Sequence, residues 1–176
     1  AVRFRLLQSI NNSVMRKSGG SMIAKNIMDR HFHFLSPSQS LKDAVRLFER
    51  ASREEGKMIF GMMVIGENDL LAGMVSMYDI LQFIRPKNIE ILGEMDDLSF
   101  EPVFENMLSR IEHITVADIM STDLNTAGPD THLMVIIDTM VKKHIRRLPV
   151  VDGGKVVGIL YRSDVFHYLM QQLTKG

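Results

Sequence analysis

A hydroxyl group and a carboxylate lie three positions apart at Ser76 and Asp79, and together they could bind a ligand. The pair follows the apolar run 70–75 and precedes the mostly apolar segment 80–84. This pattern predicts a strand that ends at Ser76 and a helix that begins near Asp79. Backbone N–H groups at a helix start are unpaired and carry partial positive charge, so the junction could hold a polyol and an anion together, as a nucleotide requires.

The same signals occur twice in the sequence. Residues 158–164 repeat the pattern of residues 73–79, and Asp164 lies 85 residues after the first carboxylate. Upstream, residues 26–28 correspond to residues 118–120 at an offset of 92. Because the order of these signals is the same in both halves, the sequence contains an internal duplication.

The duplicated pattern resembles a tandem pair of CBS (cystathionine-β-synthase) domains, the unit called a Bateman module. The resemblance covers about residues 21–173 and is strongest in the second copy, in residues 116–120, Pro129, 147–152 and 158–164. It implies an α+β (α/β-like) fold. In that fold, two β-α-β-β-α repeats pack sheet to sheet with pseudo-twofold symmetry, and ligands bind in the clefts between the sheets.

In CBS pairs, an aspartate and a Ser or Thr of one repeat hold the ribose of an adenosine nucleotide. Strand residues of the other repeat flank the adenine, and basic residues meet the phosphates. The resemblance therefore implies that Asp79 accepts both ribose hydroxyl groups, in charge-assisted hydrogen bonds worth about 1.5–3 kcal/mol each. The residues implied for this main site are Ser76, Tyr78, Asp79, Ser121, Asn125, His144, Ile145, Arg146 and Arg147.

The resemblance implies a second site around Asp164, but this site departs from the family pattern. Tyr161 replaces the Ser or Thr and would crowd the sugar, and Asp29 stands where the main site has Ser121 and would repel a phosphate. We expect this site to be weak, empty or selective for a ligand other than AMP. Its implied residues are Asp29, His33, Ile59, Phe60, Tyr161, Arg162, Ser163 and Asp164.

Simpler interpretations of the same residues remain open. Asp79 and Asp164 could be helix caps that need no ligand, and the basic run 144–147 could be a solvated surface. His31 and His33 lie on one face of an expected strand, but the sequence offers no evident third ligand, so we expect no metal site. No arrangement of nucleophile, base or paired carboxylates indicates catalysis, and we expect no enzyme activity.

The composition limits the class of protein. The chain has 176 residues, of which 45% are hydrophobic and 24% charged, and this allows one compact domain or two small ones. It has no cysteine, which excludes disulfides and thiolate metal sites. A net charge of zero argues against a general nucleic-acid binder, and no apolar run is long enough to span a membrane. We expect a cytoplasmic location.

Four segments are expected along the chain. Residues 1–20 are a packing helix, a targeting segment or a cloning remnant, and residues 85–112 are an acidic linker whose second half is helical. The two repeats occupy residues 21–84 and 113–173. The first repeat has six extra residues near positions 50–57, which lengthen its first helix or the loop that follows it.

Each repeat is expected to begin with a strand. Phe32 and Phe34 alternate with histidines as in a half-buried strand, and residues 124–127 form the equivalent strand of the second repeat. Hairpins follow at 62–75 and 148–160. Two expected helices have apolar faces, one formed by Leu41, Ala44, Val45, Phe48 and Ala51, the other by Val103, Phe104, Met107, Leu108 and Ile111.

Three functions follow from these expectations. The first is a non-catalytic regulatory module that senses an adenosine nucleotide, with AMP as the first ligand and ADP, ATP or an adenosyl compound as alternatives. The second is a dimerisation or assembly scaffold with degenerate pockets, and the third is an enzyme. We expect no required cofactor, a homodimer, and an unidentified target protein or domain.

Overall fold

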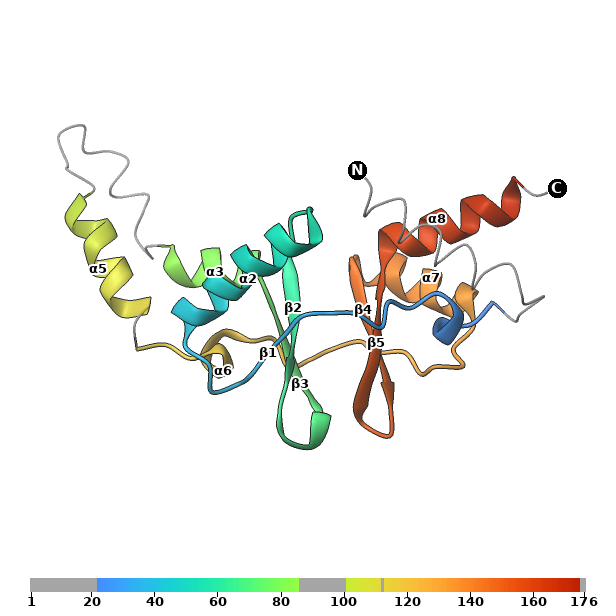
Figure 1. Cartoon of the computed structure of the whole chain (residues 1–176), viewed down its shortest axis with the longest axis horizontal. Coiled ribbons are helices and arrows are strands. Elements are labelled where there is room, and N and C mark those ends of the chain that lie inside the picture. The colour runs from blue at the N-terminus through green and yellow to red at the C-terminus, as the bar shows by residue number, and fades with distance from the viewer. Residues whose placement is uncertain (1–21, 86–100, 112, 175–176) are drawn as a thin grey trace.

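The computed structural model of the chain describes residues 22–85, 101–111 and 113–174. The expected segment 1–20 and the acidic first part of the linker lie outside these residues. The described chain forms two similar halves, each with a narrow β-hairpin whose outer side carries two helices (Figure 1). The two hairpins lie next to each other, and this confirms the mixed α+β fold with two sheet-facing repeats.

The first half contains a three-stranded sheet in the order β1-β2-β3. Strand β1 pairs parallel to β2, and β2 pairs antiparallel to β3. Its elements are β1 (Phe34–Leu35), α2 (Leu41–Glu55), β2 (Gly61–Ile65), η2 (Glu67–Asp69), β3 (Leu71–Ser76) and α3 (Met77–Ile84). The short helix η1 (Ala24–Asn26) precedes them in the chain but packs on the second half.

The second half contains the antiparallel hairpin β4-β5. One helix precedes this hairpin in the chain and another follows it. Its elements are α7 (Leu133–Lys142), β4 (Arg147–Asp152), β5 (Lys155–Tyr161) and α8 (Arg162–Leu173). Two helices that precede them in the chain, α5 (Glu101–Ile111) and α6 (Val116–Ile119), lie beside the first half instead (Figure 1).

The first segment of each repeat, which contains Asp29 or Ser121, crosses over and pairs with the other repeat. The N–H of Asp29 donates to the carbonyl of Ile159 at 2.8 Å, and the N–H of Ile159 donates back at 2.9 Å. Ser121 and Met74 exchange the equivalent two bonds, both at 2.9 Å. The crossing segments also enter the hydrophobic cores of the opposite repeats. Ala24 packs in the core of the second repeat, and Val116 packs in the core of the first.

Both crossings require a glycine on the strand beneath. A Cβ on Gly158 would lie 2.6 Å from the sulfur of Met28, and one on Gly73 would lie 2.8 Å from the sulfur of Met120. The two glycines are 85 positions apart, which is the repeat offset found in the sequence. The duplication is therefore visible in matching backbone contacts as well as in matching motifs.

The six extra residues of the first repeat lengthen its helix. Helix α2 has 15 residues, whereas its counterpart α7 has 10. Leu41, Ala44, Phe48 and Ala51 are buried as expected, but Val45 is exposed, so the expected inward position of Val45 is wrong. A 15-residue helix on one small sheet buries only a narrow stripe, and Val45 lies at its edge.

The expected first strands are shorter than predicted. Strand β1 has only two residues, Leu35 is fully buried, and Phe34 is 53% exposed, so the inward placement of Phe34 is wrong. The expected strand 124–127 is also wrong, because only Ala127 pairs, through bonds to Pro149 and Val151. Directly after Ala127 the chain turns away from β4. The Gly128 N–H donates to the hydroxyl oxygen of Thr131 at 2.9 Å in this turn.

The connecting helix α5 is only partly docked. Ile111 packs against the core of the first half, whereas Phe104 and Leu108 are exposed. Within the described chain these two residues of the expected apolar face do not pack against either repeat. Their side chains form an apolar strip that no described residue covers.

We predict that replacing Gly73 by Ala destabilises the protein by about 1–3 kcal/mol, because the new Cβ would meet the carbonyl of Ser121 at 2.9 Å and force the crossing segment outward. Urea unfolding measures this change. Gly66→Ala in the same hairpin is the control, because its Cβ would have only ordinary contacts, the nearest at 3.6 Å. Equal effects of both substitutions would show that the crossing is not tightly packed.

Candidate functional site

Ser76 and Asp79 form a capping box at the start of α3. One carboxylate oxygen of Asp79 accepts from the Ser76 N–H at 2.7 Å and from its hydroxyl group at 2.6 Å. The Ser76 hydroxyl oxygen accepts from the Asp79 N–H at 3.3 Å. The helix thus begins at Met77 with Ser76 as its cap, and the expected start near Asp79 was two residues too late because Asp79 is the third helical residue.

The capping box leaves part of the carboxylate available. The bonds described above all use Oδ2 of Asp79, and Oδ1 has no protein partner within the described part of the chain. The side chain is half-buried at the edge of the first sheet. Asp79 therefore fixes the helix start with one oxygen and could accept a ligand hydroxyl group with the other.

Arg147 reaches across the seam between the repeats. A terminal nitrogen of its guanidinium group lies 2.7 Å from the point where a Cβ on Gly61 would be, so any larger residue there would force the guanidinium group to move. Gly61 is the strand partner of Ser76, and this places Arg147 of the second repeat near the capping box of the first. Burial lowers the pKa of Arg147, and the positive charge of Arg146 lowers it further. The nearby Tyr161 has the opposite effect and raises this pKa.

The Arg147 guanidinium group has no carboxylate partner within the described residues. An arginine stays charged in proteins even when its pKa is lowered, so this half-buried charge needs a counter-ion or water. Its planar donors suit a phosphate or carboxylate group. The seam therefore offers an anion-binding side chain next to Gly61, the strand partner of Ser76.

The other residues expected at the main site are spread around this seam. Ser121 is bonded to Met74, two positions before Ser76, and is close to the junction. Asn125 and Ile145 are half-buried, whereas His144 and Arg146 are exposed. Tyr78 is 71% exposed and contributes little enclosure. The structure thus pairs Ser121 with β3, the strand that ends at Ser76, and places Arg147 against Gly61 on the neighbouring β2.

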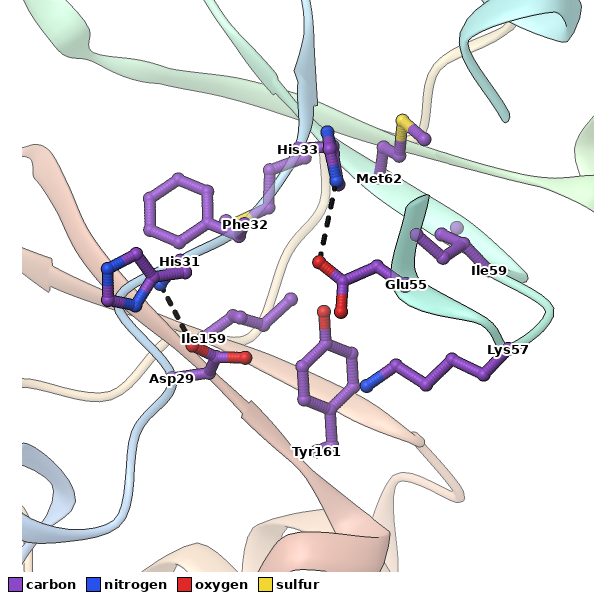
Figure 2. A pocket seen from close by; sticks show the side chains of 12 residues that line it. Asp29, His31, Phe32, His33, Glu55, Lys57, Ile59, Met62, Ile159 and Tyr161 are labelled. Atoms are coloured by element: carbon purple, nitrogen blue, oxygen red, sulfur yellow. Dashed lines mark hydrogen bonds and ion pairs between the residues drawn. The ribbon is translucent and has the colours of Figure 1, made fainter. Parts of the chain in front are cut away.

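A cavity of about 20 Å³ lies at the second site (Figure 2). Asp29, His33, Ile59 and Tyr161, four of the eight residues expected there, line it. Arg162, Ser163 and Phe60 do not line it and are exposed. Asp164 lies outside the lining as well, although its charge acts on Tyr161. The enclosed part of the cavity has room for about one water molecule.

The sequence analysis missed two residues of this cleft, Glu55 and Lys57. The Oε1 of Glu55 lies 3.6 Å from Nε2 of His33, and the Nζ of Lys57 lies 5.6 Å from the centre of the Tyr161 ring. Figure 2 shows both side chains directed toward Tyr161. Both residues lie in or beside the six-residue insertion, and the insertion was the signal that could have identified them.

Acidic groups dominate the electrostatics of the second cleft. Burial first, and then the carboxylates of Asp29, Asp164 and Glu55, together raise the pKa of Tyr161 to about 12, and the charge of Arg147 opposes this shift. Burial also raises the pKa of Asp164, while its hydrogen bond from Ser163 lowers it. A phosphate group would meet repulsion from these carboxylates.

The second junction lacks the capping box of the first. Tyr161 occupies the cap position of α8 and makes no side-chain cap bond, and Asp164 is the third helical residue. The expected helix start at Asp164 was again two residues late. Among the described residues, no three His, Asp or Glu side chains are arranged to hold a metal ion, and no helix is long and apolar enough to cross a membrane.

The comparisons with known proteins agree with this geometry. The CBS domain family model matches residues 24–86 and 116–171. The CBS domain-containing protein CBSX2, chloroplastic, of Arabidopsis thaliana is 31% identical over 169 residues, which cover 92% of this chain and 68% of that protein. An uncharacterised protein of Methanocaldococcus jannaschii is 28% identical and is covered over 94% of its length.

A solved structure adds information about a ligand. The crystal structure of CBSX2 in complex with AMP is 28% identical to this chain, with a TM-score of 0.62. The match covers 87% of this chain and 98% of that one. An inosine-5'-monophosphate dehydrogenase of Nitrosopumilus maritimus also matches, but only over 27% of its length.

We predict that one tyrosine of the folded protein ionises at about pH 12. Because the unfolded phenol ionises near 10.0, the folded state binds more protons between these values, and stability falls as the pH rises through them. Ultraviolet titration of the phenols measures the late ionisation. Tyr161→Phe should remove it, and Tyr78→Phe should leave it in place. A late ionisation that persists in Tyr161→Phe would contradict the assignment.

Proposed function

Because the chain belongs to the CBS domain family and carries two CBS domains in tandem, we propose that it is a regulatory module that senses an adenosine nucleotide. AMP is the first candidate, with ADP, ATP or an adenosyl compound as alternatives. The ligand binds in the cleft that contains Asp79, and the module has no catalytic activity of its own. The observation that supports this proposal is the Arg147 guanidinium group, which has no carboxylate partner among the described residues and lies against Gly61, the strand partner of the helix cap Ser76.

The residues of this cleft match the chemistry of a nucleoside phosphate. The open Oδ1 of Asp79 accepts the ribose hydroxyl groups, and Arg147 pairs with the phosphate. Half-buried Ile145 and the backbone near Ser121 flank the base. The AMP complex of CBSX2 supports the choice of ligand, because that protein resembles this chain over nearly its whole length in the crystal.

Binding would regulate by joining the two repeats. Asp79 belongs to the first repeat and Arg147 to the second, so a ligand that contacts both stabilises one relative orientation of the repeats. The readout is a separate target protein or an attached domain, and we propose a homodimer as the working unit. The apolar strip of Phe104 and Leu108 on α5 is compatible with such an assembly.

We predict that Asp79→Ala weakens AMP binding by at least about tenfold, because it removes charge-assisted bonds to the ribose. Isothermal titration calorimetry measures this change. The matched control is Asp118→Ala, because Asp118 caps α6 through the same two bonds from Thr115, at 2.8 and 2.7 Å. Both substitutions remove a cap and cost about 1 kcal/mol of stability, so only a difference in binding separates them.

If both variants bind AMP as tightly as the parent, Asp79 is only a cap. If the parent binds no adenosine compound at millimolar concentration and shows no thermal shift, the regulatory proposal fails and the assembly scaffold remains.

Arg147→Gln gives a second, independent test. We predict that it lowers the affinity for AMP by about tenfold or more and changes the affinity for adenosine far less, because only AMP carries the phosphate that Arg147 pairs with. Competition binding with both ligands measures the ratio. Arg46→Gln is the control, since Arg46 is an exposed arginine on α2 that pairs with Asp43 and belongs to neither expected site. A loss of affinity that is equal for AMP and adenosine would assign Arg147 a structural role.

A further inference from the structure

The insertion in the first repeat ends beside the second cleft. We call residues 51–57 the α2 extension, because helix α7 ends at the residue that corresponds to Arg50. The extension closes at Gly56, which has a left-handed φ of 64°. The hydroxyl oxygen of Ser52 then accepts from the N–H of Ile59 at 3.0 Å. The chain after the helix is therefore fixed against it.

Side chains of the α2 extension enter the second cleft. Glu55 and Glu54 face the His33 ring at 3.6 and 3.9 Å, and Lys57 reaches across the seam to the Tyr161 ring at 5.6 Å. Glu55, Lys57 and Tyr161 all line the cavity (Figure 2). The ammonium group of Lys57 is also an attractive charge for Asp164. A cation and a ring from opposite repeats thus meet where a ligand would lie.

The first cleft has no corresponding contacts within the described chain. Helix α7 ends at Lys142, and the two residues that follow, Lys143 and His144, are exposed. The cap position of α3 holds the small Ser76, where α8 has the large Tyr161. The two clefts of the duplicated chain therefore differ in three ways. The helix beside the second cleft, α2, is longer than α7, the cap residue Tyr161 is larger than Ser76, and only the second cleft has Glu55 and Lys57 beside it.

From these differences we propose that the α2 extension fills the second cleft with the chain's own Glu55 and Lys57, which close it against Tyr161. The consequence is that each chain binds one nucleotide, in the first cleft, although the duplication supplies two clefts. This inference rests on the proposed function for its ligand. Glu55, Lys57 and Tyr161 are the residues that decide which cleft is available.

The test uses two variants of the whole chain. The first carries Tyr161→Ser and Asp29→Ser, which copy the residues of the first cleft and leave the extension in place. The second adds Glu55→Ala and Lys57→Ala. Calorimetry with AMP should give a stoichiometry of one for the parent and the first variant and of two for the second variant. Two sites in the parent or in the first variant, or one site in the second, would overturn the proposal.

A ligand-independent measurement separates failure of this inference from failure of the proposed function. Hydroxyl-radical footprinting of Glu55→Ala/Lys57→Ala should show increased labelling of Tyr161, with the exposed Tyr78 as internal reference. The matched control is Glu49→Ala/Arg53→Ala, which removes an exposed ion pair of 2.7 Å from the same helix. If labelling of Tyr161 does not rise, the extension does not close the cleft, whether or not AMP binds.

Discussion

The backbone exchange between the repeats is the constraint on which the seam depends. Each crossing segment makes a reciprocal pair of hydrogen bonds with a strand of the other repeat, at Asp29–Ile159 and at Ser121–Met74. A buried backbone group that lost its partner would cost about 1–3 kcal/mol, so the two repeats cannot separate without losing several such bonds. Asp29 lines the cavity of the second site and Ser121 holds the equivalent position in the other crossing, so the bonds that hold the repeats together also fix the backbone at both residues.

Much of the fold follows from local signals in the sequence. The two hairpins, the helices and the duplication were all predictable, because they depend on apolar periodicity and on turn residues. The position of the crossing segments was not, because no local pattern states that residues 22–29 pair with the second repeat. The strand predicted at 124–127 was wrong for the same reason. The segment is held by a single bridge between Ala127 and Val150, which no local pattern in the sequence reveals.

The candidate site was predictable in its composition and less so in its geometry. The sequence identified the Ser76–Asp79 pair but placed the helix start two residues late, because a capping box uses an acidic third residue as well as a hydroxyl cap. It placed Arg147 near a phosphate, but it could not show that Gly61 makes room for the guanidinium group. Glu55 and Lys57 were missed because only the length of the insertion, and no motif, pointed to them.

The seam also shows why a duplicated chain becomes asymmetric. Arg147 and Gly61 are equivalent positions of the two repeats, and they face each other across the seam with no space for two large side chains. A long side chain from one repeat therefore requires a glycine from the other. With the arginine on one copy only, the two repeats differ in charge at this position, and they differ again where Tyr161 and Asp29 stand in place of Ser76 and Ser121. Close packing at the axis is thus sufficient to make two sequence repeats unequal in chemistry.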